Sequence, residues 1–450
     1  MSLGLPHFNI KLHPFYESDL SLIRLFIFKF NQRGRNTMEN TMLRKMKDDW
    51  EEFFFGNDNG EKELFESVTD MEANSQWIPG ISSRDIRLEA IDGRPMFIQD
   101  EMRKYHLDDE DLVDETANLG TDLLIYTGVP TSSAAFRTHE LVRNTAMDGI
   151  YAVAKLNGAA LGRMTRSKYC ECMNAAFEVA RGTSLGLMRY GKLSGLQSGA
   201  DGGYMIMPIS KLMDISAESL SGRFGDIELR TGYNTHGLTY AVWLLPDAQN
   251  RLIEMYQDAI IRSGLDSQYP INFMPAALFQ SSDTKSSCAI LDPCFILPSG
   301  ASLRFAEGVR IKHLRRSGRS EGIDLFAAEA SNIFTKFEAS VAAIAELSGI
   351  KIYNAENCLV GLCNKYGISR KYGDAAREEV SRISCGETYI SAHDLYIAMS
   401  ECIAEAERSN AKATVVNKIE ESLMKIVQIR DFSEFDVGGL VSWSNSQAAA

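Results

Sequence analysis

A series of short apolar runs between residues 204 and 320 constrains the fold more than any other feature of this chain. Tyr204–Pro208 and Thr239–Leu245 are rich in aromatic and β-branched residues, and turns that contain glycine lie beside them. Short runs of this composition, bounded by turn residues, are typical of β-strands. We therefore predict that 204–320 is mainly β, with antiparallel strands and a helix at Asp247–Arg262. Similar runs follow at Cys288–Leu291, Cys294–Leu297 and Val309–Leu314.

The C-terminal part of the chain is predicted to be helical over 321–435. Between Asp324 and Leu347 the apolar residues recur at three- and four-residue steps, which is the period of a helix with one buried face. Ser391 and Asp394 have the spacing of a capping box, so a helix is expected from Ala392, with His393 exposed in its first turn. The last residues, 436–450, are expected to form a disordered tail.

Residues 38–182 are predicted to form a mainly helical region that is first acidic and then basic. The preceding residues, 1–37, show no clean periodicity, and two hypotheses stay open for them: an over-called extension before Met38 or Met42, or a flexible arm. The predicted fold class is α+β, with a central antiparallel β region between helical N-terminal and C-terminal parts. Helices of the first region are expected at Met42–Phe55, Glu61–Met71, Asp100–Ala117, Ser133–Lys155 and Lys168–Arg181.

Seven glycines lie between Gly182 and Gly203, together with several serines. A run so rich in glycine is costly to order. It predicts a Gly/Ser-rich loop or linker over 183–203, and this is the best candidate for a domain boundary. A loop that carries Arg189 and Lys192 and closes over a ligand is the alternative.

Charge is distributed unevenly along the sequence. The formal net charge is −13, but residues 39–122 contain 23 acidic side chains against 9 Lys and Arg, so the rest of the chain sums to about +1. Residues 123–199 carry 9 Lys and Arg against four acids. The acidic character therefore belongs to one segment, and basic segments follow it.

The stretch 302–319 concentrates cations in a predicted strand and the turn after it. Alternation along Val309–Leu314 sends Val309, Ile311 and His313 to one face and Arg310, Lys312 and Leu314 to the other. A strand with one cationic face suits a phosphate backbone. An edge strand protected from aggregation by its charges is the alternative, as is a protein or small-anion partner. The candidate nucleic-acid-binding residues are Arg304, Arg310, Lys312, His313, Arg315, Arg316 and Arg319, with Arg189 and Lys192 from the earlier basic segment.

Catalytic motifs are sparse in this sequence. His236, Asp283 and His313 lie in turns or at a strand end and form a hypothetical acid–base or metal set, although no spacing demands that they meet. There is no nucleophile elbow, no HExxH and no dinucleotide fingerprint, so no cofactor is predicted. The eight cysteines lack the spacing of a zinc site, and most are expected to be buried in a reducing compartment.

A resemblance covers residues 203–430. It rests on Gly203–Leu212, on the polar turn Gln280–Ser287, and on Val309–His313, a basic strand that ends in a histidine. Asp292–Phe295 and Thr388–Tyr396 extend it. In this order the segments resemble a family of uncharacterised phage/plasmid-like proteins of mobile elements. The resemblance implies a phage or plasmid setting and no particular chemistry.

Three classes of function follow as hypotheses. The first is a non-enzymatic accessory protein that binds single- or double-stranded DNA through its basic segments. The second is a self-assembling structural protein, which would be a homo-oligomer, and the third is a hydrolase-type enzyme that uses His236, Asp283 and His313. No apolar run approaches the length of a membrane span and no signal peptide is evident, so a cytoplasmic protein without a membrane partner is expected.

Overall fold

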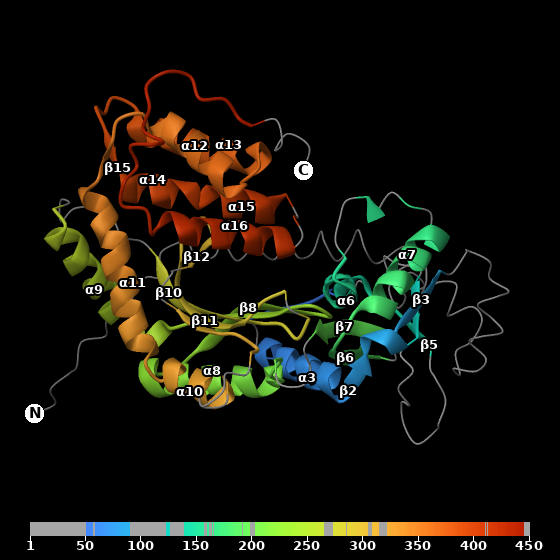
Figure 1. The fold of residues 1–450 in the computed structure, drawn as a ribbon. Coiled ribbons are helices and arrows are strands. Elements are labelled where there is room, and N and C mark those ends of the chain that lie inside the picture. The colour runs from blue at the N-terminus through green and yellow to red at the C-terminus, as the bar shows by residue number, and fades with distance from the viewer. Residues whose placement is uncertain are drawn as a thin grey trace, which may run out of the picture. The chain divides into compact units, whose positions relative to one another are not determined.

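The computed structural model combines helices with antiparallel sheets, which confirms the predicted α+β class (Figure 1). The structure describes residues 51–56, 59–90, 123–126, 139–156, 160–161, 164, 166–190, 192–198, 203–264, 273–284, 286–304, 308–314, 322–409, 411 and 413–444. The predictions for 1–37 and for a helix at Asp100–Ala117 lie outside them.

A seven-stranded antiparallel sheet forms the centre of the described chain, and the runs Thr239–Leu245, Cys288–Leu291 and Cys294–Leu297 contribute strands to it as predicted, whereas Tyr204–Pro208 forms none of its strands. Neighbouring strands follow the order β1-β8-β9-β10-β11-β12, and β13 pairs with β11 beyond the end of β12. Every residue of β11 is buried, so this strand shows no polar alternation; strands covered on both faces have this pattern. The strands are β1 (Glu51–Phe55), β8 (Glu228–Thr235), β9 (Thr239–Leu244), β10 (Met274–Ser281), β11 (Ala289–Ile296), β12 (Ser302–Arg304) and β13 (Val309–Ile311).

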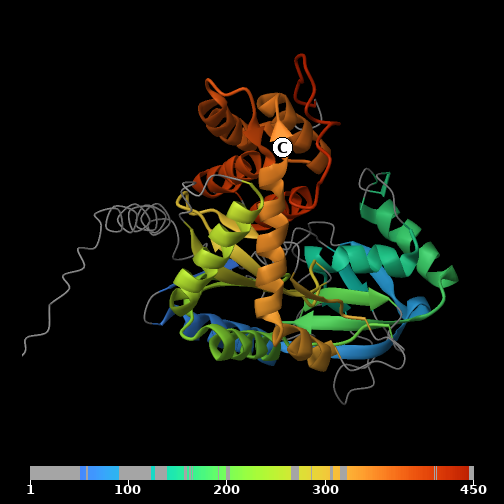
Figure 2. The same ribbon diagram turned by 90° about the vertical axis from the view of Figure 1, so that its left-hand side faces the viewer.

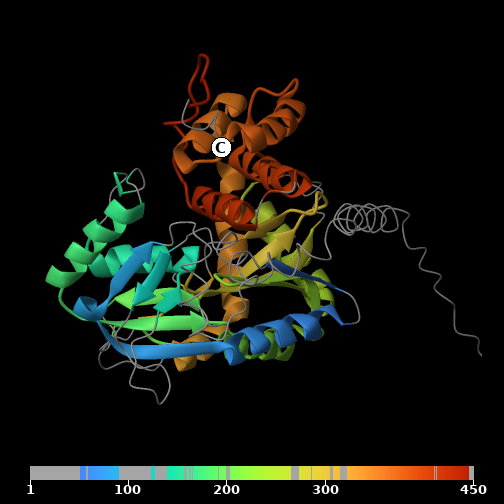
Figure 3. The same cartoon turned by 90° about the vertical axis from the view of Figure 1, so that its right-hand side faces the viewer.

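Helices cover both faces of this sheet. Figure 1, Figure 2 and Figure 3 place α3 (Gly60–Ala73) and α8 (Ile209–Phe224) on one side, and α16 (Ala413–Ile426) on the other. Helix α8 occupies residues that the strand prediction for 204–320 assigned to β structure. The predicted helix at Asp247–Arg262 is confirmed as α9 (Gln249–Arg262).

The region before residue 203 contains two three-stranded sheets, and the mainly helical prediction for 38–182 is therefore wrong for much of it. Residues 51–55 form strand β1 where a helix was expected, and 139–141 form strand β5. Helices α3 and α7 (Arg166–Val179) are confirmed, and α6 (Met147–Ala154) is the end of the helix expected over 133–155. The two sheets are β2 (Ser75–Ser82), β6 (Thr183–Arg189) and β7 (Lys192–Ser198), and β3 (Arg87–Ala90), β4 (Leu123–Tyr126) and β5 (His139–Leu141).

The predicted linker at 183–203 is instead the buried hairpin β6–β7. Its glycines serve packing. A Cβ atom at Gly186 would lie 2.8 Å from a methyl carbon of Ile81, so the strand approaches its neighbour closely only because this residue has no side chain. The glycine content of this segment predicted a flexible loop. In the structure the glycines allow neighbouring strands to pack closely.

Helix α6 packs against β7 through Gly149. A Cβ atom there would lie 2.0 Å from the carbonyl oxygen of Leu196, which is a backbone atom and cannot rotate away. We expect Gly149→Ala to lower the free energy of unfolding by about 1–3 kcal/mol. The control is Gly222→Ala in α8, where no heavy atom lies within 4 Å of the added methyl group. It should leave stability unchanged or raise it by up to about 1 kcal/mol. Urea denaturation of both variants measures the difference, and equal effects would contradict this packing.

The C-terminal region is helical, as predicted. Ser391 and Asp394 form the predicted capping box, in which the Ser391 hydroxyl accepts from the Asp394 N–H at 3.0 Å. His393 is buried rather than exposed, and it contacts the hydroxyl of Tyr256. The elements are α10 (Gly322–Ala330), α11 (Ile333–Glu346), β14 (Lys351–Ile352), α12 (Ala355–Tyr366), α13 (Arg370–Ser384), β15 (Ile390–Ser391), α14 (Ala392–Met399), α15 (Glu401–Arg408) and α16.

Residues 436–444 of the tail predicted to be disordered have a defined path, and 445–450 lie outside the described residues. Residues 436–444 contain no helix or strand, but side chains of α12 hydrogen-bond their backbone. Five of the eight cysteines are buried, which confirms their predicted place in the core.

Candidate functional site

Residues 309–314 alternate between buried and more exposed side chains, as predicted, but strand β13 ends at Ile311 and is shorter than the strand expected over Val309–Leu314. Val309, Ile311 and His313 are buried, whereas Lys312 is exposed and the Arg310 side chain is 31% exposed. Arg310 forms an ion pair with Asp292 at 2.5 Å, so its charge is partly compensated. The candidate residues Arg315, Arg316 and Arg319 lie outside the described residues.

Arg304 does not belong to this surface, which corrects the prediction. Its side chain is fully buried, and its guanidinium lies 3.0 Å from Asp292 and 3.5 Å from Glu420. It also donates to the side chains of Gln280 and Asn417, at 3.2 and 2.7 Å. The reason is its strand position: Arg304 lies opposite Cys294 on β11, a fully buried strand, and its side chain reaches α16 in the interior.

Arg189 and Lys192 are likewise buried, so neither presents its charge to a large polyanion. Both belong to the β6–β7 hairpin that replaces the predicted loop. Arg189 donates to Asp283 at 2.7 Å, to the His236 carbonyl at 2.5 Å and to the Ser75 hydroxyl at 3.0 Å. One guanidinium therefore connects β2 with the β8–β9 and β10–β11 turns.

His236, Asp283 and His313 belong to one buried network. Arg189 contacts the first two, and the Tyr204 hydroxyl lies 3.2 Å from both the Asp283 carbonyl and Nδ1 of His313. The rings of Tyr204 and His313 are stacked, with centroids 5.4 Å apart. All three predicted residues are at least nine-tenths buried, so the network resembles a structural link more than an open reaction site.

Burial perturbs the proton affinity of this network in opposite directions. It raises the pKa of Asp283 to about 6, although Arg189 opposes the shift. It lowers the pKa of His313 to about 4, against the effect of the hydrogen bond to the Met205 carbonyl. Desolvation disfavours the charged form of each group, so the carboxyl holds its proton more tightly than the imidazole does. Both the carboxyl and the imidazole are thus neutral between about pH 4 and 6.

Sequence reasoning missed Tyr204, Asp292 and Glu420. A usable signal exists for Asp292, which lies in the apolar run Ala289–Ile296, where a buried carboxylate needs a cationic partner. No local signal identifies Arg304 as that partner, because the three residues of this ion-pair network are far apart in sequence. Asp292 lies 12 positions before Arg304, and Glu420 lies 116 positions after it.

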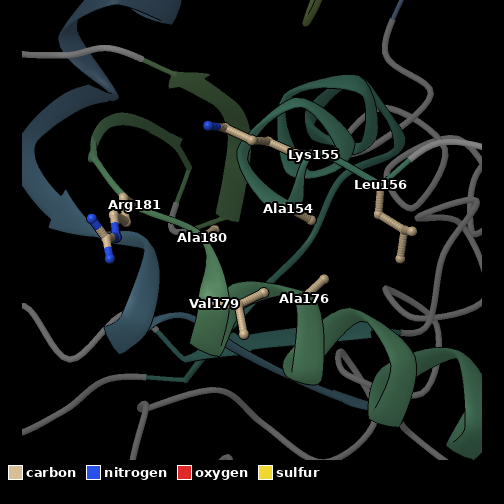
Figure 4. Close-up of a pocket in the computed structure, with 7 residues that line it drawn as sticks. All are labelled: Ala154, Lys155, Leu156, Ala176, Val179, Ala180 and Arg181. Atoms are coloured by element: carbon tan, nitrogen blue, oxygen red, sulfur yellow. The ribbon is translucent and has the colours of Figure 1, made fainter.

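A pocket of about 450 Å³ lies between the C-terminal ends of α6 and α7 (Figure 4). Lys155 and Arg181 contribute its cations, and each follows the end of one of these helices. Helix C-termini carry partial negative charge, and Lys and Arg side chains near them are stabilising. The positions of Lys155 and Arg181 are therefore explained by the two helix ends. The pocket therefore gives no reason to infer an anionic ligand. Its remaining lining is apolar: Ala154, Leu156, Ala176, Val179 and Ala180.

Within the described ranges, no three or more His, Cys, Asp and Glu side chains gather in a way that could hold a metal ion. No helix in this part of the chain is both long and apolar enough to cross a membrane. No protein-family model, curated protein or solved structure matches the chain.

Proposed function

We propose that this is a non-enzymatic, cytoplasmic nucleic-acid-binding protein of a phage or plasmid. Its contact surface would be the cationic edge, defined as Arg310, Lys312, Arg315, Arg316 and Arg319. The exposure of Lys312, directly after the end of β13, with Val309 and Ile311 of that strand buried, is the observation that carries the proposal.

The proposed surface is smaller than the set of nine residues expected from sequence. Arg304, Arg189, Lys192 and His313 are buried and act inside the protein. The five remaining cations lie within ten consecutive residues, 310–319, that contain no acidic side chain. Such a cluster would contact phosphates without reading base sequence, because it offers charge rather than a pattern of hydrogen bonds to base edges.

Charge reversal tests this surface directly. We expect Lys312→Glu/Arg315→Glu/Arg316→Glu to weaken binding to a fluorescent duplex oligonucleotide by about 100-fold at low salt, and to reduce the salt slope by about 3. Anisotropy titration measures both quantities, with single-stranded DNA of the same length as a second probe.

The control variant is Arg84→Glu/Lys211→Glu/Lys418→Glu. These three side chains are exposed elsewhere, and their reversal changes the net charge by the same amount. It should weaken binding only slightly. Equal losses in the two variants would mean that total charge, and not the cationic edge, governs DNA binding, and the proposal would then be wrong.

The enzymatic alternative depends on His236, Asp283 and His313. Arg189 and Tyr204 connect these residues, but their burial and their hydrogen bonds to backbone carbonyls favour a role in holding the turns together. The self-assembling alternative depends on contacts of the C-terminal segment and not on the cationic edge.

A further inference from the structure

The segment Asp431–Ser444, here called the C-terminal strap, runs beside α12 (Figure 1). It has no regular secondary structure, and Leu440 near its middle is 94% exposed. The segment nevertheless has a defined path, because two sets of contacts hold it.

The first set consists of asparagine side chains on α12 that pair with the strap backbone. The Asn357 amide donates to the carbonyls of Val437, at 2.9 Å, and Gly439, while its own carbonyl accepts from the Val441 N–H at 3.3 Å. Asn364 repeats this arrangement one step further along. Its amide donates to the Ser442 carbonyl and its carbonyl accepts from the Ser444 N–H, both at 3.0 Å.

The second set consists of side chains of the strap that fill gaps left by glycines. Phe435 is buried beside Gly361 of α12, where an added Cβ would lie 3.1 Å from its ring. The Trp443 ring would lie 2.4 Å from a Cβ at Gly373 of α13. Asp436 adds a polar anchor by accepting from the backbone N–H groups of Tyr353 and Asn354, at 3.0 and 2.6 Å.

These contacts have the chemistry of a peptide-binding groove. A side-chain amide offers N–H donors and a carbonyl acceptor, which complement the carbonyl and the N–H of an extended peptide, so it binds backbone whatever the side chains are. The two glycine gaps add selectivity for aromatic side chains at two positions of the bound segment. We define the α12 groove as Asn357, Gly361, Asn364 and Gly373.

We propose that the α12 groove also binds the strap of a second copy of this chain, so that two molecules exchange their C-terminal segments. A strap that binds the groove of a second copy makes the same contacts as a strap that binds the groove of its own chain. The exchange therefore changes few interaction energies, and such domain swapping is a low-cost route to a dimer. The strap is attached to α16 through the short segment Val427–Arg430, and within one chain its high effective concentration favours the closed monomer. High protein concentration should therefore populate the exchanged dimer.

Complementary variants of the full chain test the exchange. Phe435→Ala/Trp443→Ala weakens the strap and leaves the groove intact, whereas Asn357→Ala/Asn364→Ala weakens the groove and leaves the strap intact. In sedimentation velocity each variant alone should stay monomeric, and their equimolar mixture should form a dimer, because only the mixture pairs an intact groove with an intact strap. A mixture that stays monomeric at every concentration would overturn the proposal.

A labelled synthetic peptide of residues Asp431–Ser444 gives an independent measurement. It should bind the Phe435→Ala/Trp443→Ala chain at least tenfold more tightly than the wild-type chain, whose own strap competes. Adding Asn357→Ala/Asn364→Ala to that chain should remove this gain. Circular dichroism of each variant establishes that it is folded before binding is compared. Peptide binding that ignores the two asparagines would contradict the proposed groove, whereas failure of DNA binding would leave it unaffected.

Discussion

Arg304→Met is expected to lower the free energy of unfolding by about 3–5 kcal/mol, the loss typical of a buried ion pair from which one partner is removed. The substitution preserves much of the side-chain volume but leaves Asp292 and Glu420 in the interior without their shared guanidinium. Burial already raises the pKa of both carboxyls, and Arg304 opposes that shift for each of them. Their charge would therefore become costly once the arginine is lost.

Arg382→Met is the matched control for this experiment. Arg382 contacts Glu379 through two hydrogen bonds, at 2.5 and 2.8 Å, but its side chain is 70% exposed. Solvent screens an exposed pair and its contribution to stability is small, so this variant should remain close to wild type in urea denaturation. The triple variant Arg304→Met/Asp292→Asn/Glu420→Gln should recover part of the loss, since it removes the uncompensated charges. A loss below 1 kcal/mol for Arg304→Met would contradict the buried network.

As the pH rises from about 4 to 6, the free energy of unfolding of Asp283→Asn should increase by about 3 kcal/mol relative to that of wild type. In wild type the pH-dependent contributions of Asp283 and His313 have opposite signs and cancel over this range, and the substitution removes one of them. In the folded chain burial raises the pKa of Asp283 to about 6, from an ordinary value of about 4. Its contribution to stability is present in acid and is lost as the pH rises through 6.

His313 acts with the opposite sign. Burial lowers its folded pKa to about 4, against an ordinary value of about 6.5, so its contribution is present at neutral pH and is lost as the pH falls through 4. His313→Gln should therefore lose about 3 kcal/mol relative to wild type as the pH rises from about 4 to 6. Chemical denaturation at a series of pH values measures these differences.

Thr284→Val is the control for the pH series. Thr284 lies next to Asp283 and donates to the Gly237 carbonyl at 3.2 Å, but it does not titrate in this range. It should displace the whole stability curve without changing its slope. Parallel curves for wild type, Asp283→Asn and His313→Gln would show that neither buried group has the perturbed proton affinity that its environment implies.

The sequence was sufficient to predict an antiparallel sheet within 204–320 and the buried side chains of 309–314, although it assigned the residues of β1 to a helix. Both depend on local patterns: short β-branched runs in one case, and alternation over six residues in the other. The capping box at Ser391 is also local, and it formed as expected. Patterns of this kind succeed because neighbouring residues alone determine them.

The remaining features depend on partners that are distant in sequence. Gly186 and Gly195 indicate a linker by composition, and only the approach of Ile81 and Leu187 reveals that they are packed strand residues. Arg304 and Arg189 look like surface cations until Asp292, Glu420 and Asp283 are placed beside them. Because nothing in the local sequence encodes those contacts, the candidate interface was predicted too large.

The salt dependence of duplex DNA binding by the wild-type chain tests the proposed function most directly. With three to five cations of the cationic edge on phosphates, a plot of log K against log salt should fall with a slope between about −3 and −4.5. A slope near zero, or no retention of DNA at low salt, would contradict the proposal that this edge binds nucleic acid.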